Sequence, residues 1–304
     1  MSAAVILKEY GDIDVLQVVD LPRPVPGPGQ ALVEVRAAGI NPGEASIRKG
    51  LLHERWPATF PSGQGSDFAG AVAEVGDGVD TVTVGEAVIG FVHTRSSHAQ
   101  FVVADAADLT PKPENVPWPV AGALFVAGTT AYAAVRAVAP RPGDTVVVSG
   151  AAGGVGSLTV QLARAAGARV IGIASAANHE WLRGHGVIPV PYGDGVVDRI
   201  RAIGGVDAFI DTFGGGYVAQ AVELGVPLDR IDTIIDFAAA AEYGVRTAGN
   251  SDAASADVLA ELAGMVSKGE LEIPIAATYP LTEVRAAFRE LERRHTRGKI
   301  VLVP

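Results

Sequence analysis

One segment of the chain, residues 144–175, restricts the fold more than any other. It begins with a continuous apolar run at 145–149 and passes through the glycine-rich stretch GAAGGVG at 150–156. A helical stretch follows, and then a second apolar run at 169–173. Short apolar runs without polar alternation are typical of strands buried on both faces of a parallel sheet. The order strand, glycine turn, helix and strand therefore predicts the first unit of a doubly wound domain.

The glycine stretch also suggests a nucleotide site. Glycines let the backbone turn tightly and approach a pyrophosphate, while the start of the following helix offers free N–H groups and a positive dipole. Gly156 would let the helix pack closely against the strand. The alternative is an ordinary helix-start turn with incidental small residues. Because the glycines stand between two apolar runs and before a helix, the sequence favours the dinucleotide site.

The rest of the chain divides into a β-rich part and a helix-rich part. Residues 1–120 alternate short β-branched runs with Gly and Pro clusters, which is typical of a β-rich domain. From there on, helical stretches alternate with apolar runs, the last of them at 230–237, and predict further parallel strands. Residues 256–268 and 281–294 read as amphipathic helices. We therefore expect a two-domain α/β protein.

The residues after the second apolar run indicate which dinucleotide is bound. An enzyme that uses NAD usually has Asp or Glu there, which bonds the ribose 2′-hydroxyl and repels a 2′-phosphate. This chain has Ser175, Asn178 and His179 instead. The hydroxyl and the amide can donate to a phosphate, and the imidazole adds charge when protonated. NADPH is therefore the expected cofactor; the alternative is that Ser175 or Asn178 only caps the helix that follows.

Composition and charge exclude several other classes of function. The chain has no cysteine, so disulfides, thiolate zinc sites and a cysteine nucleophile are absent. Its six histidines show no pair at ligand spacing, and we expect no metal. A net charge of −10 opposes binding to nucleic-acid phosphates. With no apolar run of membrane-spanning length and no signal-peptide pattern at the N-terminus, a cytoplasmic protein without membrane contact is expected.

Five short motifs occur in the order and at the spacing of one known family. They are GINPGEASIRKG (39–50), GSDFAGAV (65–72), GTTAY (128–132), AAGGVG (151–156) and HTRGKIVL (295–302). On these motifs, the chain resembles over its whole length the quinone oxidoreductase branch of the medium-chain dehydrogenase/reductase superfamily, which includes zeta-crystallin-like proteins.

The resemblance implies both a domain order and a chemistry. A GroES-like catalytic domain would comprise residues 1–120 and 270–304, with a Rossmann NADPH-binding domain inserted at 121–269. Where zinc-dependent alcohol dehydrogenases of this architecture carry Cys and His ligands, this chain has Asn41 and Ser66. Without a Lewis acid, alcohol oxidation loses its usual driver. Hydride transfer to a quinone or to the C=C of an α,β-unsaturated carbonyl remains feasible.

Position by position, the resemblance also implies contacts with NADPH. Asn41 would lie beside the nicotinamide ribose, and Thr129 near the nicotinamide or its phosphates. The other implied cofactor-binding residues are Gly153, Gly154 and Val155 at the pyrophosphate, Ser175, Asn178 and Tyr192 around the 2′-phosphate, and Gly298 and Lys299 closing over the cofactor. Three of them could also have no contact with the cofactor: Asn41 as a turn residue, Tyr192 as a surface aromatic and Lys299 as a solvated lysine.

Two positions depart from the family pattern. Many members carry Tyr where this chain has Ser46, so that tyrosine is missing as a proton donor or aromatic wall. A basic residue of the family near the adenosine ribose is replaced by His179. We therefore expect a catalytic site with Asn41 and Ser46, in which positioning supplies much of the rate and water or Ser46 supplies the proton.

Two other functions stay open at this point. A carrier- or CoA-linked enoyl reductase, or another biosynthetic tailoring enzyme of this fold, should show basic residues at the mouth of its site. Arg48, Lys49 and Arg55 are the only early basic cluster. A non-catalytic NADPH-binding structural protein is the alternative of another class. The resemblance also implies a homodimer, formed through the edge of the Rossmann sheet.

Overall fold

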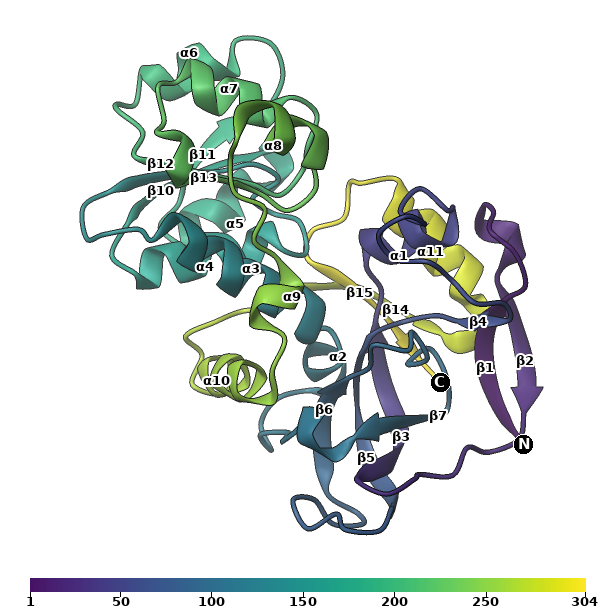
Figure 1. Cartoon of the computed structure of the whole chain (residues 1–304). Helices are drawn as coiled ribbons and strands as arrows, with labels where there is room; N and C mark the ends of the chain where they lie inside the picture. Colours follow the sequence, from purple (N-terminus) through teal and green to yellow (C-terminus); the bar gives the residue numbers. More distant parts are fainter. The chain divides into compact units, whose positions relative to one another are not determined.

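The computed structural model describes all residues from 1 to 304, in two compact units (Figure 1). Unit 1 comprises Met1–Val126 and Ser255–Pro304, and unit 2 comprises Ala127–Ala254. The chain leaves unit 1 once and returns to it, so unit 2 is an insertion in the sequence of unit 1. None of the helices is both long and apolar enough to cross a membrane.

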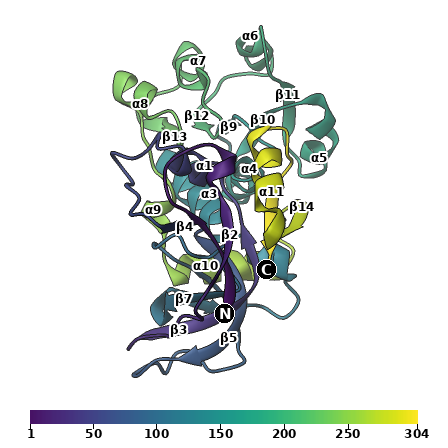
Figure 2. The same cartoon turned by 90° about the vertical axis from the view of Figure 1, so that its right-hand side faces the viewer.

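Unit 1 is built mainly from antiparallel strands. Its larger sheet has seven strands in the order β14-β15-β3-β5-β6-β8, and β7 also pairs with β3. These strands are β3 (Gln30–Gly39), β5 (Asp67–Val75), β6 (Ala87–Phe91), β7 (Phe101–Asp105), β8 (Leu109–Pro111), β14 (Ile275–Pro280) and β15 (Lys299–Val303). A smaller sheet of order β2-β1-β4 comprises β1 (Ser2–Leu7), β2 (Gln17–Leu21) and β4 (Ser62–Gly63). β1 and β2 run antiparallel beside each other (Figure 1), and Figure 2 shows β2 from a second direction.

The end of the chain adds two strands to the larger sheet of unit 1. β15 pairs antiparallel with β3, with Val301 opposite Gly39. Gly39 permits a close approach there, because a Cβ on it would lie 2.8 Å from Asp67 Oδ2 and 3.0 Å from Ala123 Cα. The helices of this unit are α1 (Pro42–Arg48), α2 (Trp118–Ala121), α10 (Ala256–Ser267) and α11 (Val284–Glu292), together with the start of α3 (Phe125–Val138).

Unit 2 contains a five-stranded sheet of order β11-β10-β9-β12-β13, in which every neighbouring pair is parallel. Its strands are β9 (Thr145–Val148), β10 (Arg169–Ala174), β11 (Ile188–Pro191), β12 (Ala208–Asp211) and β13 (Ile231–Thr233). Every residue of β9 and β12 is buried, as expected for strands covered on both faces. The other helices of this unit are α4 (Gly156–Ala165), α5 (His179–Gly184), α6 (Val196–Arg201), α7 (Tyr217–Glu223), α8 (Phe237–Tyr243) and α9 (Asn250–Ala253).

The strand order places a topological switch at β9. The chain moves outward from β9 to β10 and β11, and then returns to add β12 and β13 on the other side of β9. In open sheets of this kind, ligands bind outside the carboxyl ends of the strands at such a reversal. The predicted α/β fold, a GroES-like β-rich domain plus a doubly wound domain, is confirmed.

Two details differ from the sequence-based expectation. The apolar run at 230–237 forms only the short strand β13, because Asp236 accepts a hydrogen bond from Ala239 N at 3.1 Å and begins α8. Helix α10, which lies at 256–267, packs against β6 and β8 and is grouped with unit 1 rather than with the inserted unit. Its buried face requires an apolar partner, and these strands provide one.

Candidate functional site

The glycine stretch forms the turn between β9 and α4 in unit 2. Gly150 has a φ of +56°, in the left-handed region that favours glycine. A Cβ on Gly156 would lie 2.2 Å from the Gly150 carbonyl oxygen, so only glycine lets α4 begin this close to the turn. The close approach expected at Gly156 is therefore present, and its partner is the turn backbone rather than the strand.

The turn presents free hydrogen-bond donors. The main-chain amides of Gly154 and Val155 donate to no carbonyl of the chain, whereas Gly153 N donates to Gly150 O at 2.8 Å. Gly154 and Val155 lie at the amino end of α4, a ten-residue helix, where free amides and the helix dipole favour an anion. The chemistry of this turn fits the pyrophosphate of a dinucleotide.

A buried carboxylate that the sequence analysis did not single out organises the neighbouring loop. Asp211 ends β12 and is fully buried. It accepts hydrogen bonds from Ser149 Oγ at 2.6 Å and from Thr233 Oγ1 at 2.8 Å. It also accepts from the main-chain N of Phe213 at 3.0 Å and of Gly214 at 2.9 Å. An acidic residue that ends an apolar run was the signal for this role in the sequence.

The structure brings Ser175 and Asn178 together after β10. Asn178 Nδ2 donates to Ser175 Oγ at 3.0 Å. Neither side chain caps the helical turn that follows it, so the capping alternative is wrong. Because the Ser175 hydroxyl accepts from the amide, its own proton can be donated to an incoming acceptor.

Tyr192 lies at the same edge of the sheet as Ser175. β10 and β11 are parallel neighbours with Ala174 opposite Pro191, so Ser175 and Tyr192 each follow the end of a neighbouring strand. The Tyr192 side chain is 56% exposed. His179 Nε2 lies 3.2 Å from the Ala174 carbonyl oxygen.

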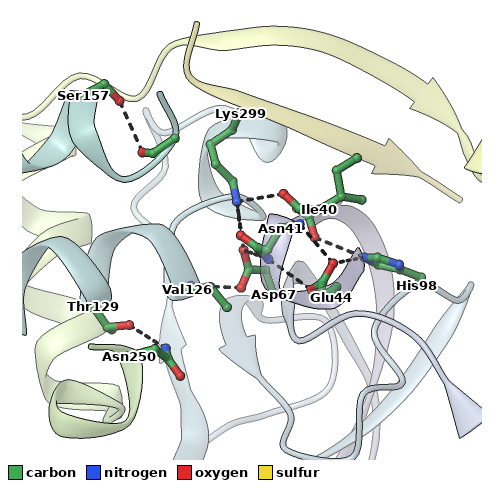
Figure 3. A network of polar contacts seen from close by, with 12 residues as sticks. Ile40, Asn41, Glu44, Asp67, His98, Val126, Thr129, Ser157, Asn250 and Lys299 are labelled. Carbon is green, nitrogen blue, oxygen red and sulfur yellow. Dashed lines mark hydrogen bonds and ion pairs between the residues drawn. The ribbon is translucent and has the colours of Figure 1, made fainter. Parts of the chain in front are cut away.

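Thr129 lies on α3 and is fully buried. Its Oγ1 accepts a hydrogen bond from Asn250 Nδ2 at 2.7 Å (Figure 3). Asn250, the first residue of α9, was not among the residues expected from the sequence. Since 121 positions separate the two residues, only the fold of unit 2 reveals this pair.

In unit 1, Asn41 lies at the centre of a buried polar network (Figure 3). Its main-chain N donates to Glu44 Oε2 at 3.0 Å, which ties it to the first turn of α1. Its side-chain Nδ2 donates to Glu44 Oε1 at 3.1 Å and to Asp67 Oδ2 at 3.3 Å. Asn41 therefore does more than turn the chain before α1.

Lys299 supplies the cation of this network. Its Nζ donates to Ile40 O at 3.0 Å and to Asn41 Oδ1, and it lies 3.7 Å from Asp67 Oδ2. With only 3% of its surface exposed, Lys299 is not a solvated lysine at the end of a strand. Its three N–H donors all face groups of unit 1. Asp67 also accepts from Val126 N at 2.9 Å, near the start of α3.

Burial shifts the titration of the acids and the histidine in this network. It raises the pKa of Glu44 and raises that of Asp67 to about 6, while Lys299 acts in the opposite direction on both. Burial lowers the pKa of His98 to about 4, so its ring is neutral at pH 7. His98 Nε2 lies 3.1 Å from Gly39 O. Two acids and one ammonium group thus share a site with little solvent.

Ser46 and Gly298, the remaining predicted residues, lie in unit 1. Ser46 Oγ donates within α1 to Pro42 O at 3.3 Å. Gly298 has a φ of +75°, and a Cβ on it would lie 2.0 Å from Pro274 O, so the chain requires glycine there. No group of three or more His, Asp or Glu side chains has a geometry that could hold a metal ion.

The predicted site residues therefore fall into two groups. Asn41, Ser46, Gly298 and Lys299 belong to unit 1, where Asn41 and Lys299 are in direct contact. The group in unit 2 comprises Thr129, Gly153, Gly154, Val155, Ser175, Asn178 and Tyr192. In that group, Ser175 and Asn178 are in direct contact.

Family models match most of the chain. Residues 27–114 match the alcohol dehydrogenase GroES-like domain, and residues 154–227 and 192–302 match two models described as zinc-binding dehydrogenase. The first match covers strands of unit 1. The other two include the amino end of α4 and the end of the chain.

Individual proteins are similar over the whole length. The synaptic vesicle membrane protein VAT-1 homolog of Rattus norvegicus is 30% identical, over 98% of this chain and 83% of that protein. The structure of the quinone oxidoreductase from Coxiella burnetii has a TM-score of 0.90 at 31% identity, covering 100% of this chain and 99% of that one. The CurK enoyl reductase has a TM-score of 0.86 at 26% identity, covering 99% of both chains. This chain belongs to the medium-chain dehydrogenase/reductase superfamily, in its quinone oxidoreductase-like branch.

Proposed function

We propose that this oxidoreductase uses NADPH to transfer hydride to a quinone or to the C=C of an α,β-unsaturated carbonyl, and that it needs no zinc. The observation that carries the proposal is the pair of free amides of Gly154 and Val155 at the amino end of α4. They fit a pyrophosphate at the switch point of the sheet, where nicotinamide dinucleotides bind in such folds.

The choice of NADPH over NADH is supported by the end of β10. Residues 174–179 include no carboxylate that would bond a ribose 2′-hydroxyl and repel a phosphate. Instead, Asn178 holds the Ser175 hydroxyl as a donor, and Tyr192 lies beside them at the next strand end. These three residues would surround the 2′-phosphate.

NADPH, when bound, supplies the hydride. Asn41 would accept a hydrogen bond from the nicotinamide ribose, because both hydrogens of its amide already point to Glu44 and Asp67. Lys299 would contribute by holding Asn41 in that orientation. The remaining cofactor-binding residues of the proposal are Thr129 near the nicotinamide, Gly153, Gly154 and Val155 at the pyrophosphate, and Gly298 before β15.

The proton for the reduced acceptor would come from water or from Ser46. Ser46 Oγ makes only a long hydrogen bond of 3.3 Å to Pro42 O, which a substrate oxygen could replace. Because a quinone or enone spreads negative charge onto a conjugated oxygen, a weak donor suffices. Most of the rate would then come from orientation.

Independence of zinc is supported by the donor set around Asn41. Its Oδ1 accepts from the Lys299 ammonium group, which also faces Asp67 at 3.7 Å. A divalent cation at this position would be repelled by that ammonium group. We expect activity to survive prolonged treatment with EDTA and 1,10-phenanthroline, and a complete loss that zinc restores would contradict this part of the proposal.

A second candidate function is a carrier- or CoA-linked enoyl reductase, which the similarity to the CurK enoyl reductase favours. Such an enzyme needs free basic residues for a phosphate of its handle. Arg48 is fully buried and bonds Glu292 Oε1 at 2.6 Å, and Lys49 bonds Glu292 Oε2 at 2.5 Å. Asp12 Oδ1 also lies 3.5 Å from Arg48 Nη2 and 3.6 Å from Lys49 Nζ, so two acids face these two basic residues. This pairing favours a small quinone or enone.

A single panel of assays tests these alternatives. NADPH oxidation is followed with quinones, alkenals and enoyl thioesters, and NADH is run in parallel. We expect turnover with a quinone or alkenal and preference for NADPH. Turnover confined to enoyl thioesters would favour the second candidate. Consumption of neither cofactor with any acceptor would favour a non-catalytic NADPH-binding protein.

A homodimer formed at the sheet edge remains a prediction. Arg246 already pairs with the outer side of β13, since Thr233 N donates to Arg246 O and Arg246 N to Ile231 O, both at 3.0 Å. A dimer contact on this side would therefore be made by the segment around Arg246. Light scattering after gel filtration measures the molar mass in solution and therefore the oligomeric state.

A further inference from the structure

Arg199 was not expected to have a role, yet it is bonded to the loop that carries Tyr192. This loop, residues 192–195, joins β11 to α6 (Figure 1). Arg199 Nη2 donates to the carbonyl oxygens of Pro191 at 2.9 Å and Gly193 at 3.1 Å, with that of Tyr192 at 3.4 Å. Nη1 donates to Asp194 O at 2.7 Å. The guanidinium group is thus held by four consecutive carbonyls.

The charge of Arg199 is not cancelled by these contacts. Carbonyl dipoles solvate a cation but leave its net charge, and a guanidinium group stays ionised. No carboxylate oxygen lies within the 4.0 Å of an ion pair from Arg199. Its neighbour Arg201, in contrast, pairs with Asp198 at 3.5 Å and Glu223 at 3.3 Å. The two arginines of α6 therefore differ in free charge.

The position of this charge is set by the register of the sheet. Pro191 lies opposite Ala174, and neighbouring strands are about 4.8 Å apart. Pro191 carries the first of the four carbonyls that bond Arg199. It therefore lies one strand away from Ala174, the residue before Ser175. Asn178 and Ser175 are polar but neutral, so they bring no charge of their own to this edge.

Neutral His179 does not supply a positive charge at this edge of the sheet. Its Nε2 faces the Ala174 carbonyl oxygen at 3.2 Å, a contact that requires the proton on Nε2. The ring is thus bonded back to the strand that precedes it. A positive charge on it would require a second proton, on Nδ1.

We propose that Arg199 supplies the positive charge that selects a ribose 2′-phosphate over a 2′-hydroxyl at this edge of the sheet. The inference rests on the proposed function for the cofactor and for the roles of Ser175, Asn178 and Tyr192. The four carbonyls hold the guanidinium group before any ligand arrives, so little ordering is needed on binding.

The test is a comparison of dissociation constants by fluorescence titration with NADPH and NADH. Adenosine 2′,5′-bisphosphate and 5′-AMP serve as probes that lack the nicotinamide, and displacement of NADPH reports their binding. We expect Arg199→Met to weaken NADPH and the bisphosphate about ten-fold and NADH and 5′-AMP less than two-fold. The matched control Arg201→Met, which removes an already paired arginine of the same helix, should leave the ratio unchanged.

Arg199→Lys separates charge from loop geometry, because lysine keeps the charge but cannot bond four carbonyls. We expect it to keep most of the preference for NADPH, and we expect added salt to reduce that preference in the wild type but not in Arg199→Met. Equal weakening of both cofactors in Arg199→Met, or equal loss in Arg199→Lys and Arg199→Met, would overturn the inference. A thermal melt of each variant shows whether it is folded.

A wrong cofactor and a wrong role of Arg199 would give different results in these titrations. If the wild type prefers NADH, the proposed cofactor is wrong and the role of Arg199 is wrong with it. If the wild type prefers NADPH and Arg199→Met keeps the full preference, the proposed function stands and only the role of Arg199 is wrong.

Discussion

Two buried acidic centres, one in each unit, differ in whether a cation accompanies the carboxylates. In unit 2, Asp211 accepts from two hydroxyls and two main-chain amides, all of them neutral donors. In unit 1, Glu44 and Asp67 accept from the side-chain amide of Asn41 and each from one main-chain amide, and both are also acted on by the single ammonium group of Lys299. Burial raises the pKa of both acids in unit 1.

The difference shows how a protein can place charge in its interior. Around Asp211, neutral donors bond both carboxylate oxygens without a partner cation and fix the loop that supplies two of them. Two carboxylates beside one cation leave an excess negative charge with little solvent, so that the site takes up a proton more readily than isolated acids would. We therefore expect the loop bonded to Asp211 to be held rigidly. We expect the stability contribution of the centre in unit 1 to depend on pH.

The largest effect is expected from Asp211→Ala. Four donors would lose their acceptor, two of them main-chain amides of the loop after β12. We expect the free energy of unfolding, measured by urea titration, to fall by about 3 kcal/mol or more. Thr233→Val, which removes one donor to the same carboxylate, should cost about 1 kcal/mol. A loss below 1 kcal/mol in Asp211→Ala would mean that water replaces the carboxylate.

Lys299→Met tests the centre in unit 1, which contains Glu44 and Asp67. Without the ammonium group, the pKa values of Glu44 and Asp67 rise further, since Lys299 lowers both. At pH 8 we expect a loss of about 3 kcal/mol, because two buried acids then lack a cation. At pH 5 the loss should be smaller, since the folded state retains protons on these acids. Lys268→Met, at an exposed lysine, is the control. A loss that does not depend on pH would contradict the electrostatic explanation.

Asp232 lies near Asp211 in the same sheet but lacks its donors. Its Oδ1 accepts from Ala248 N at 2.7 Å, its Oδ2 has no partner, and burial raises its pKa from 3.8 to about 7. The folded state therefore binds this proton more tightly than the unfolded state, and the contribution of Asp232 to stability falls as pH rises from about 4 to 7. Asp232→Asn should remove about 2 kcal/mol of that fall, measured by urea titrations across this range. An unchanged pH dependence would place the titration elsewhere.

The smallest effect is expected from Ser46→Ala. Since water can replace this hydroxyl, we expect kcat for quinone or enone reduction to fall less than ten-fold, with the dissociation constant of NADPH unchanged. A thousandfold loss of kcat with intact NADPH binding would instead identify Ser46 as an essential proton donor. Thr83→Ala, at an exposed hydroxyl in a distant loop, is the control for handling and folding.

Sequence patterns were informative where they reflect local geometry. The turn at 150–156 could be predicted because glycine is required by a positive φ at Gly150 and by a 2.2 Å approach at Gly156. The absence of an acid after β10 could likewise be read directly. The β-rich and doubly wound parts follow from the spacing of apolar runs and turn residues.

The polar partners could not be predicted, because they depend on contacts between distant segments. Lys299 reaches Asn41 across 258 positions, and Asn250 reaches Thr129 across 121. Arg199 is close to Tyr192 in the sequence, yet only the bend of the loop turns four carbonyls onto its guanidinium group. Nothing in the residue types alone indicates such a contact.

The fold class, the family and the glycine turn follow from the order of the amino acids, since these depend on periodicity and on residues that no other side chain can replace. Which charges have an acidic partner depends on the folded chain. Lys299 and Arg48 are neutralised by buried or half-buried acids, whereas Arg199 is held by carbonyls and keeps its charge. The physical reason is that the effect of a charge depends on its partners and on the surrounding solvent, and both are set by packing.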